Sequence, residues 1–209
     1  MHNVPRHPTR STALRYRWTM LLLTLASACL AILPPGLSAR DRRLPRVPSE
    51  FTVPAGHRLF LLGHATGTQQ YICLPTSSGV AWTLFGPQAT LFSKEDHQIV
   101  THFLSPNPDE GGMARATWQH SRDSSTVWAQ RIATSSDPHF VGSDAIPWLL
   151  LQVVGAEEGP TGGHRLTGTT HIQRIHTSGG QAPISGCTQT ADVGKSALVP
   201  YTADYLFYQ

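Results

Sequence analysis

The sequence predicts an all-β domain, built as an antiparallel β-sandwich or a barrel-like sheet. Its 209 residues include 18 Gly and 16 Pro, and such a composition is typical of short strands joined by many turns. From residue 51 onward, short apolar runs alternate with turn residues. The last candidate strand has the clearest period, because aromatic or small side chains occupy every second position from Tyr201 to Phe207. That alternation predicts a strand with one face on the core.

The candidate strands are separated by turns about every eight to twelve residues, which is the spacing of sandwiches and barrels. Gly63 and Gly67 lie between the first two candidates, and Gly86-Pro87 joins the next two. Residues 121–125 form the turn of a predicted hairpin. The run 146–154 is the most apolar, and we interpret it as a buried strand, with a short helix as the alternative. The candidate ranges are 58–62, 70–74, 80–85, 89–92, 98–104, 115–120, 126–132, 146–154, 166–176 and 201–208.

Residues 1–39 have the layout of a secretory signal peptide. Four arginines precede an apolar run over residues 18–33, and a Pro-Pro-Gly break then leads to small residues before Arg40. The run is shorter than the ~20 residues that a membrane-spanning helix needs. We therefore predict an N-terminal signal helix, cleavage after Ala39, and an exported chain, secreted or periplasmic, without a membrane span. A lipoprotein is the open alternative, because Ala26-Ser27-Ala28-Cys29 resembles the box whose cysteine is lipidated.

After the leader, the sequence predicts a short arm and one domain. Residues 40–50 are polar and contain Pro45 and Pro48, so we expect an extended arm before a single β domain over residues 51–209. The whole chain has a net charge of +3. Without the four leader arginines, 12 basic and 13 acidic side chains remain. A nucleic-acid-binding domain needs a basic patch of its own, so nucleic acid is not an expected partner.

Two cysteines, Cys73 and Cys187, follow the leader. An even pair of cysteines in an oxidising compartment predicts a disulfide. The bridge would close a loop of about 115 residues, and the chain-entropy model gives ~5 kcal/mol for a loop of that length. Two buried free thiols are the alternative.

The sequence carries none of the common catalytic motifs. It has no Gly-x-Ser-x-Gly turn, no Cys-x-x-Cys pair, and no glycine-rich dinucleotide loop after a strand, so we expect no cofactor. Nine of the 11 histidines follow the leader. Two ligands on one strand need an even spacing to face the same way, whereas His97 and His102 are five residues apart, as are His171 and His176. A metal site is therefore not predicted from spacing.

Four residues remain as candidates for function. His102 and His120 are candidates for an enzyme site, metal-assisted or not, assembled from His and Asp side chains of different strands. Trp118 belongs to a set of aromatic residues that either line a sugar-binding face or pack in the core. Asp204 interrupts an apolar strand, so its carboxylate is either buried and functional or exposed on the outer face.

Several short motifs resemble a family of exported bacterial and fungal proteins known as domain of unknown function 3455. In chain order they are Val-Pro-Ala-Gly at 53–56, Gly-Thr-Gln-Gln-Tyr-Ile-Cys at 67–73, Trp-Thr-Leu-Phe-Gly-Pro-Gln-Ala at 82–89, Ile-Pro-Trp-Leu-Leu at 146–150, Ile-Gln-Arg at 172–174, Thr-Ser-Gly-Gly at 177–180, Gly-Cys at 186–187 and Val-Pro-Tyr-Thr-Ala-Asp-Tyr at 199–205. The resemblance implies an exported single domain with paired cysteines, and it implies no catalytic residues.

The middle of the chain departs from the family pattern. After His102 that pattern has Gly-Pro-Thr-Trp and then Asp-Gly-Ser, where this chain has Ala116-Thr117-Trp118 and Asp123-Ser124-Ser125. Taken together, the residues predict an exported, non-catalytic module that binds a glycan, an envelope component or an extracellular protein surface. The alternatives are a secreted enzyme with a site assembled across strands and a structural envelope protein.

Overall fold

The computed structural model describes residues 45–209, which form one compact unit from Pro45 to Gln209. The predicted signal peptide, the lipoprotein alternative at Cys29 and the first part of the polar arm lie outside the described residues. Within the described part, no helix has the length and apolar character needed to cross a membrane.

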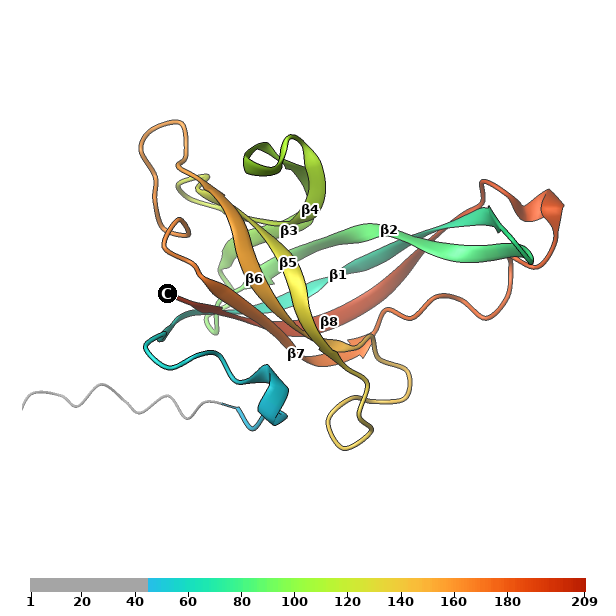
Figure 1. Ribbon diagram of the computed structural model, residues 1–209, viewed down its shortest axis with the longest axis horizontal. Coiled ribbons are helices and arrows are strands. Elements are labelled where there is room, and N and C mark those ends of the chain that lie inside the picture. Colours follow the sequence, from blue (N-terminus) through green and yellow to red (C-terminus); the bar gives the residue numbers. More distant parts are fainter. Residues whose placement is uncertain (1–44) are drawn as a thin grey trace, which may run out of the picture. The chain divides into compact units, whose positions relative to one another are not determined.

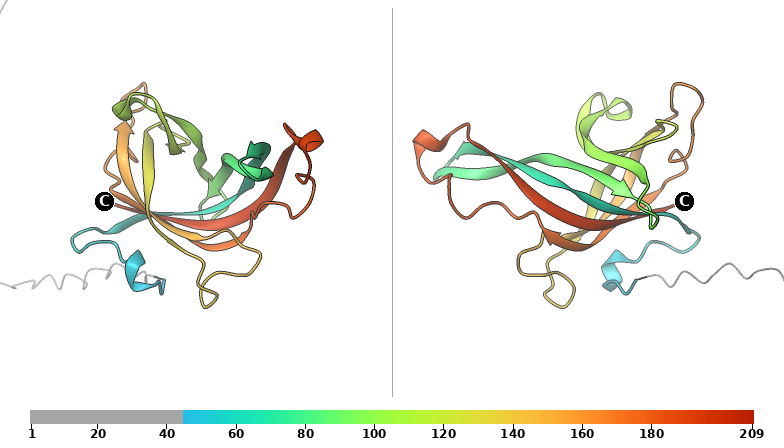
Figure 2. Two further views of the ribbon diagram at one scale, coloured as in Figure 1. Left: turned by 45° about the vertical axis from the view of Figure 1, so that its right-hand side comes forward. Right: turned by 180° about the vertical axis from the view of Figure 1, so that it is seen from behind.

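The unit is a closed barrel of eight antiparallel strands, and each strand pairs with the next along the chain (Figures 1 and 2). The first strand also pairs with the last, which closes the sheet into a barrel. The strands are β1 (Leu59–Thr76), β2 (Gly79–Phe92), β3 (Gln98–Asn107), β4 (Met113–His120), β5 (Thr126–Ser135), β6 (Trp148–Glu157), β7 (His171–Gly179) and β8 (Ser196–Tyr208). Residues 45–209 contain no α-helix, only three short 3-10 turns: η1 (Ser49–Phe51), η2 (Pro108–Glu110) and η3 (Thr190–Asp192). The predicted all-β fold and its barrel-like form are confirmed.

Strand β1 is longer than its sequence indicates, because Gly63 and Gly67 do not interrupt it. Both glycines lie where β1 passes close to β2. A Cβ atom on Gly67 would collide with the carbonyl oxygen of Gln88 and with Ala89, and one on Gly63 would lie 2.9 Å from the Cβ of Leu91. These glycines therefore permit close approach between strands, and the prediction that they separate two strands was wrong.

Strand β2 likewise runs through Gly86-Pro87, where a turn was expected. Pro87 lies opposite Gln69 of β1. On its other side β2 is unpaired at this point, because its register with β3 covers only Ala89 to Phe92. Proline lacks the N–H donor that a ladder on both sides would use, so it fits a strand that is paired on one side only. The two merged pairs of candidates explain why ten predicted ranges became eight strands.

The remaining strand predictions hold with shifted ends. The apolar run at 146–154 is strand β6 rather than a helix, and the hairpin around residues 121–125 joins β4 to β5. Strand β7 begins at His171 instead of residue 166, because residues 166–170 form a turn in which the Thr169 N–H donates to the Leu166 carbonyl at 2.9 Å.

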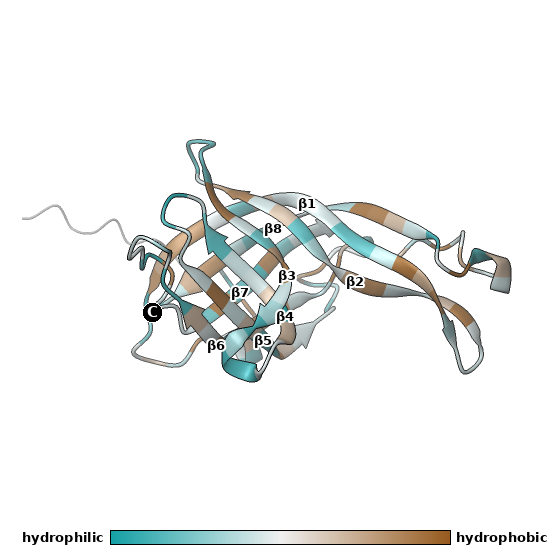
Figure 3. Ribbon diagram, turned by 90° about the horizontal axis from the view of Figure 1, so that it is seen from above, coloured by the Kyte–Doolittle hydropathy of each residue, from teal (hydrophilic) through white to brown (hydrophobic). Residues whose placement is uncertain are grey.

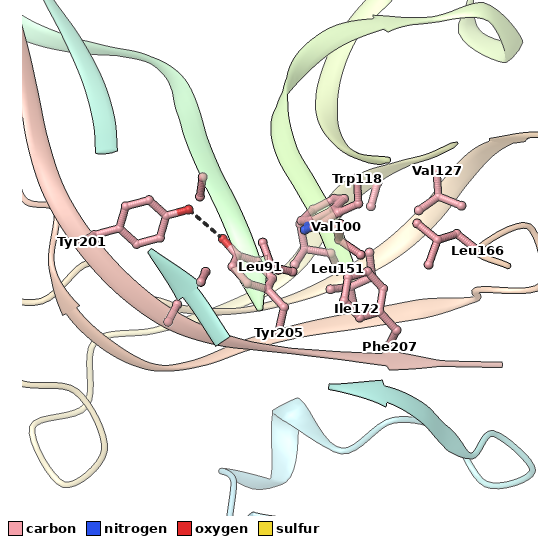
Figure 4. Packing of buried hydrophobic residues seen from close by; sticks show 14 of the residues in the cluster. Leu91, Val100, Trp118, Val127, Leu151, Leu166, Ile172, Tyr201, Tyr205 and Phe207 are labelled. Atoms are coloured by element: carbon pink, nitrogen blue, oxygen red, sulfur yellow. Dashed lines mark hydrogen bonds between the residues drawn. The ribbon is translucent and has the colours of Figure 1, made fainter. Parts of the chain in front are cut away.

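The larger of two apolar clusters fills the barrel and draws buried residues from all eight strands. Figure 4 shows Trp118, Ile172, Tyr205 and Phe207 in this cluster. Strand β8 contributes its odd-numbered residues from Tyr201 to Phe207, so the face predicted to lie on the core does so. Figure 3 shows how hydrophobic and hydrophilic residues alternate along the strands.

The second cluster covers the outer face of β6, β7 and β8. Leu206 and Tyr208 of β8 pack there with Trp148, and the N-terminal segment lies over them through Phe51, which is 0% exposed. The side-chain amide of Gln173 donates to the Phe51 carbonyl at 2.6 Å and holds this segment to β7. The β5–β6 loop completes the cover. The N-terminal segment therefore gives this part of the barrel wall a core on both of its faces.

The disulfide between Cys73 and Cys187 is present, as predicted, with Cα atoms 5.5 Å apart. Cys73 lies near the end of β1, in the part of the sheet where β1, β2 and β8 extend beyond the other strands (Figure 1). Cys187 belongs to the long β7–β8 connection. The backbone N–H of Cys73 also donates to the Lys195 carbonyl at 2.8 Å. The bridge thus fixes the β7–β8 connection to the extension.

Candidate functional site

A cavity of about 210 Å³ opens into the barrel where β2 parts from β3. Its wall is formed by residues of seven strands, of which β2 contributes residues 84–87 and β3 contributes His102 and Leu104. Gly86-Pro87 lies in the part of β2, residues 79–88, that has no register with β3, so the end of the β2–β3 ladder and the opening coincide. We call this cavity the mouth pocket.

The rim of the mouth pocket is apolar and exposed. Leu84, Phe85 and Leu104 line it, and they are 52%, 59% and 38% exposed. Large side chains of this kind are uncommon as neighbours on a soluble surface unless the surface binds something. The rim is therefore suited to contact with an apolar group.

His102 lies at the inner wall, stacked on Trp118 with ring centroids 4.2 Å apart and planes 9° apart. It is 2% exposed, and its Nδ1–H donates to the Thr117 carbonyl at 2.8 Å, which leaves Nε2 without a proton. Burial lowers the pKa of His102 to about 3, and the nearby Arg174 charge acts in the same direction, against the hydrogen bond to Thr117. His102 is therefore neutral at physiological pH.

Three buried hydrogen-bond donors of the pocket wall have no acceptor. They are Nε2 of Gln69, Nε1 of Trp118 and Nε of Arg174. Among the described residues only one other buried side-chain donor lacks an acceptor. It is Nε1 of Trp148, which lies in the outer cluster. Buried polar groups are nearly always paired, so the concentration of three around one cavity indicates a place prepared for acceptor atoms.

Arg174 brings a positive charge into the barrel from β7. Its Nη2 donates to the Pro147 carbonyl at 2.8 Å. The charge of Arg174 lowers the pKa of His102. It also opposes the increase in pKa that burial causes at Tyr201 and Tyr205, so the guanidinium lies close to all three groups. The hydroxyls of Tyr201 and Tyr205 are 3.3 Å apart (Figure 4), and burial keeps both tyrosines protonated.

Of the four candidates from the sequence, the structure brings His102 and Trp118 together in the mouth pocket. His120 lies elsewhere, where its Nδ1–H donates to the carboxylate of Asp123 at 2.9 Å. Asp204 lies on the outer face of β8 and accepts from His64 at 2.6 Å and from His176 at 2.9 Å. In residues 45–209 no group of three or more His, Cys, Asp or Glu side chains has an arrangement that could hold a metal ion.

Asp123 organises the β4–β5 turn. Its carboxylate accepts from the hydroxyl of Ser125 at 2.8 Å and from the backbone N–H of Arg165 at 2.8 Å, which ties the turn to the β6–β7 connection. Burial would raise the pKa of Asp123, but these hydrogen bonds outweigh it and hold the pKa well below its ordinary value. Ser124 has φ = 58°, a left-handed conformation that favours glycine. The turn thus has Ser at a position whose backbone conformation favours glycine.

A second cavity, of about 470 Å³, lies between the β5–β6 loop and the start of the β7–β8 connection. Its lining contains no charged side chain. Tyr71 donates to the Gly180 carbonyl at 2.7 Å and Gln181 donates to the Ser143 carbonyl at 2.9 Å, so these polar groups are already satisfied. We therefore take the smaller mouth pocket as the candidate site.

A family model described as "Protein of unknown function (DUF3455)" matches residues 54–209. The chain belongs to the DUF3455 family. No curated protein and no solved structure matches it. The match includes every residue of the mouth pocket and both cysteines of the DUF3455 domain.

Sequence reasoning missed Gln69 and Arg174 as pocket residues, and it considered Tyr205 only as one of the aromatic residues that line a binding face or pack in the core. Each lies in a motif that carries the family resemblance, and Arg174 also interrupts an apolar strand between Ile172 and Ile175. That interruption was the signal in the sequence, since an arginine is rarely found among the inward-facing residues of a barrel strand unless it has a function.

Proposed function

We propose that this DUF3455 domain is an exported, non-catalytic binding barrel that takes a small molecule into the mouth pocket. The observation that carries this proposal is the set of unpaired donors. Gln69 and Trp118 are 2% and 1% exposed, yet Nε2 of the first and Nε1 of the second lack acceptors beside the cavity. An unsatisfied buried donor costs about 1–3 kcal/mol, and a bound ligand with acceptor atoms removes that cost.

The size and lining of the pocket favour a compact organic ligand. A cavity of about 210 Å³ is smaller than the roughly 300–1,000 Å³ of drug-sized sites. Most residues of the wall are apolar, such as Leu84, Leu104 and Leu151, and a few polar groups lie among them. Small-molecule sites have this division between an apolar wall and a few orienting polar groups. A long glycan or a protein surface does not fit such an opening.

The lining also favours binding over catalysis. It contains one histidine and no carboxylate, thiol or aliphatic hydroxyl. The pKa of that histidine, His102, is about 3, so it is a weak base at physiological pH. The other candidates, His120 and Asp204, pair with groups outside the pocket.

Binding is tested on the secreted protein by nuclear magnetic resonance. The indole N–H of Trp118 is the reporter, since a ligand acceptor that pairs with it moves its resonance, and Trp118→Phe assigns that resonance. We expect compact aromatic and aliphatic compounds with acceptor atoms to shift it. Ala116→Phe, which fills the wall of the pocket, abolishes the shift, while Ala156→Phe at an exposed position of β6 preserves it. Failure of every compound, or shifts that persist in Ala116→Phe, contradicts the proposal.

Export is supported by the layout of residues 1–39 and by a disulfide, which persists in oxidising compartments. Expression of the full chain in a bacterium tests it. We expect secreted or periplasmic protein that begins at Arg40, with no reactive thiol when it is denatured without reductant. Retention of the intact chain in the cytoplasm contradicts export, and a lipidated N-terminus at Cys29 identifies the lipoprotein alternative.

A further inference from the structure

The charge of the mouth pocket narrows the class of its ligand; this inference rests on the proposed function. Arg174 keeps its proton at all physiological pH values. In the described part of the chain, no Asp or Glu oxygen lies within 4 Å of its guanidinium. Its Nε is buried and unpaired, and Nη2 reaches only a neutral carbonyl, that of Pro147. Arg174 is half-buried as a residue, and buried charged atoms are normally paired, so the wall of the barrel carries a cation without a carboxylate partner among the described residues.

The neighbouring groups do not neutralise this charge. His102 is neutral with its Nδ1–H engaged by Thr117. The hydroxyls of Tyr201 and Tyr205 stay protonated because burial disfavours their anions. The pocket therefore carries one full positive charge, and the complementary ligand carries one negative charge.

The donors also define the shape of the ligand's polar end. Nε of Arg174 on β7, Nε2 of Gln69 on β1 and Nε1 of Trp118 on β4 belong to residues that line the same cavity, and all three atoms are buried and lack acceptors. A guanidinium matches the two oxygens of a planar carboxylate, and the lone pairs of those oxygens are numerous enough for all three donors. A phosphate dianion would bring a second negative charge, and the lining has no second cation for it.

The other end of the pocket calls for hydrocarbon. Leu84, Phe85 and Leu104 form an exposed rim that an apolar body would cover. We propose that the ligand is a compact organic monocarboxylate, whose carboxylate accepts hydrogen bonds from Arg174, Gln69 and Trp118 and whose apolar body lies against the rim.

Isothermal titration of the secreted protein tests this class with four probes: benzoate, its neutral isostere benzamide, the cation benzylamine, and inorganic phosphate. We expect benzoate to bind at least about tenfold more tightly than benzamide, as a charge-assisted pair requires, and benzylamine and phosphate to bind more weakly still. Arg174→Met should weaken benzoate at least about tenfold and leave benzamide nearly unchanged. Arg131→Met, an exposed arginine of β5, is the matched control and should change neither.

The outcomes separate the two proposals. Equal affinity for benzoate and benzamide, or tighter binding of phosphate, overturns the carboxylate and leaves the binding barrel standing. So does the absence of benzoate binding when other compounds shift the Trp118 resonance. If no compound shifts that resonance, both proposals fail. Arg174→Lys keeps the positive charge and serves as a control for misfolding of Arg174→Met. If Arg174→Lys still prefers benzoate over benzamide and Arg174→Met does not, the inference is supported. If both variants keep the preference for benzoate, the inference is overturned.

Discussion

The neutral state of His102 should make the barrel sensitive to mild acid. His102 is 2% exposed, and its folded-state pKa of about 3 lies far below the ordinary value of 6.5. Protons therefore bind the unfolded chain more readily than the folded one between these two values. The stabilising effect of a neutral His102 is complete above about pH 6.5 and is lost progressively as the pH falls toward about 3.

The magnitude follows from the two pKa values. Each pH unit inside this window is worth about 1.4 kcal/mol. Between about pH 7 and pH 4.5 the protonation of unfolded His102 should cost the folded state about 2.5 kcal/mol of its free energy of unfolding. This is a large share of the 5–15 kcal/mol that is typical of a domain.

Urea unfolding at these two pH values, followed by tryptophan fluorescence, measures the effect. His102→Phe keeps a flat ring against Trp118 but cannot be protonated, so the wild type should lose about 2.5 kcal/mol more than the variant on acidification. Other groups titrate in both proteins and cancel in the comparison, including His171, whose pKa burial also lowers. Equal losses in the two proteins would show that folded His102 accepts a proton without penalty and would refute the conclusion that burial keeps it neutral.

Further predictions concern the elements that stabilise the barrel. Phe51→Ala removes a fully buried ring from the outer cluster and should cost about 3–5 kcal/mol in urea unfolding, whereas Phe85→Ala at the exposed rim should change stability by about 0.5 kcal/mol or less. Gly67→Ala should destabilise by about 1–3 kcal/mol because its Cβ meets β2, while Gly168→Ala, whose nearest neighbour would be 3.8 Å away, should be tolerated. Asp123→Asn should lower stability at neutral pH. The difference in free energy of unfolding between wild type and variant should narrow as the pH falls below about 4, because the unfolded chain takes up a proton at Asp123 there while the folded chain, in which the pKa of Asp123 is held well below its ordinary value, does not. An unchanged difference between about pH 7 and about pH 3 would contradict this.

The sequence was informative where a local pattern decides the structure. Alternation in β8 predicted the face that fills the barrel, and two cysteines after a predicted leader predicted the bridge between Cys73 and Cys187. Both inferences need only side-chain direction or residue count. The interpretation of Gly67 failed because glycine serves turns and close strand contacts equally well. Which of these applies depends on the partner strand, and a single strand does not specify its partner.

The candidate site was only half predictable for the same reason. His102 and Trp118 lie opposite each other on paired strands, so a hairpin prediction brings them together. Gln69, Arg174 and Tyr205 reach the same cavity from β1, β7 and β8, and their convergence depends on closure of the barrel between its first and last strands. Asp204 and Tyr205 are adjacent in sequence but face opposite sides of β8, so one pairs with histidines outside while the other lines the pocket.

The mouth pocket coincides with the part of β2 that has no ladder to β3. Pro87 has no N–H to offer β3, and the β2–β3 ladder begins only two residues later, at Ala89. A barrel whose ladder was complete at this point would close the wall over Trp118 and Arg174 and leave their donors without any possible acceptor. The gap instead opens the barrel beside those donors and places the exposed Phe85 at its edge. The β2–β3 ladder stops at Ala89, close to Trp118 and Arg174, and under the proposed function this gap is the route by which a ligand would reach the charged interior.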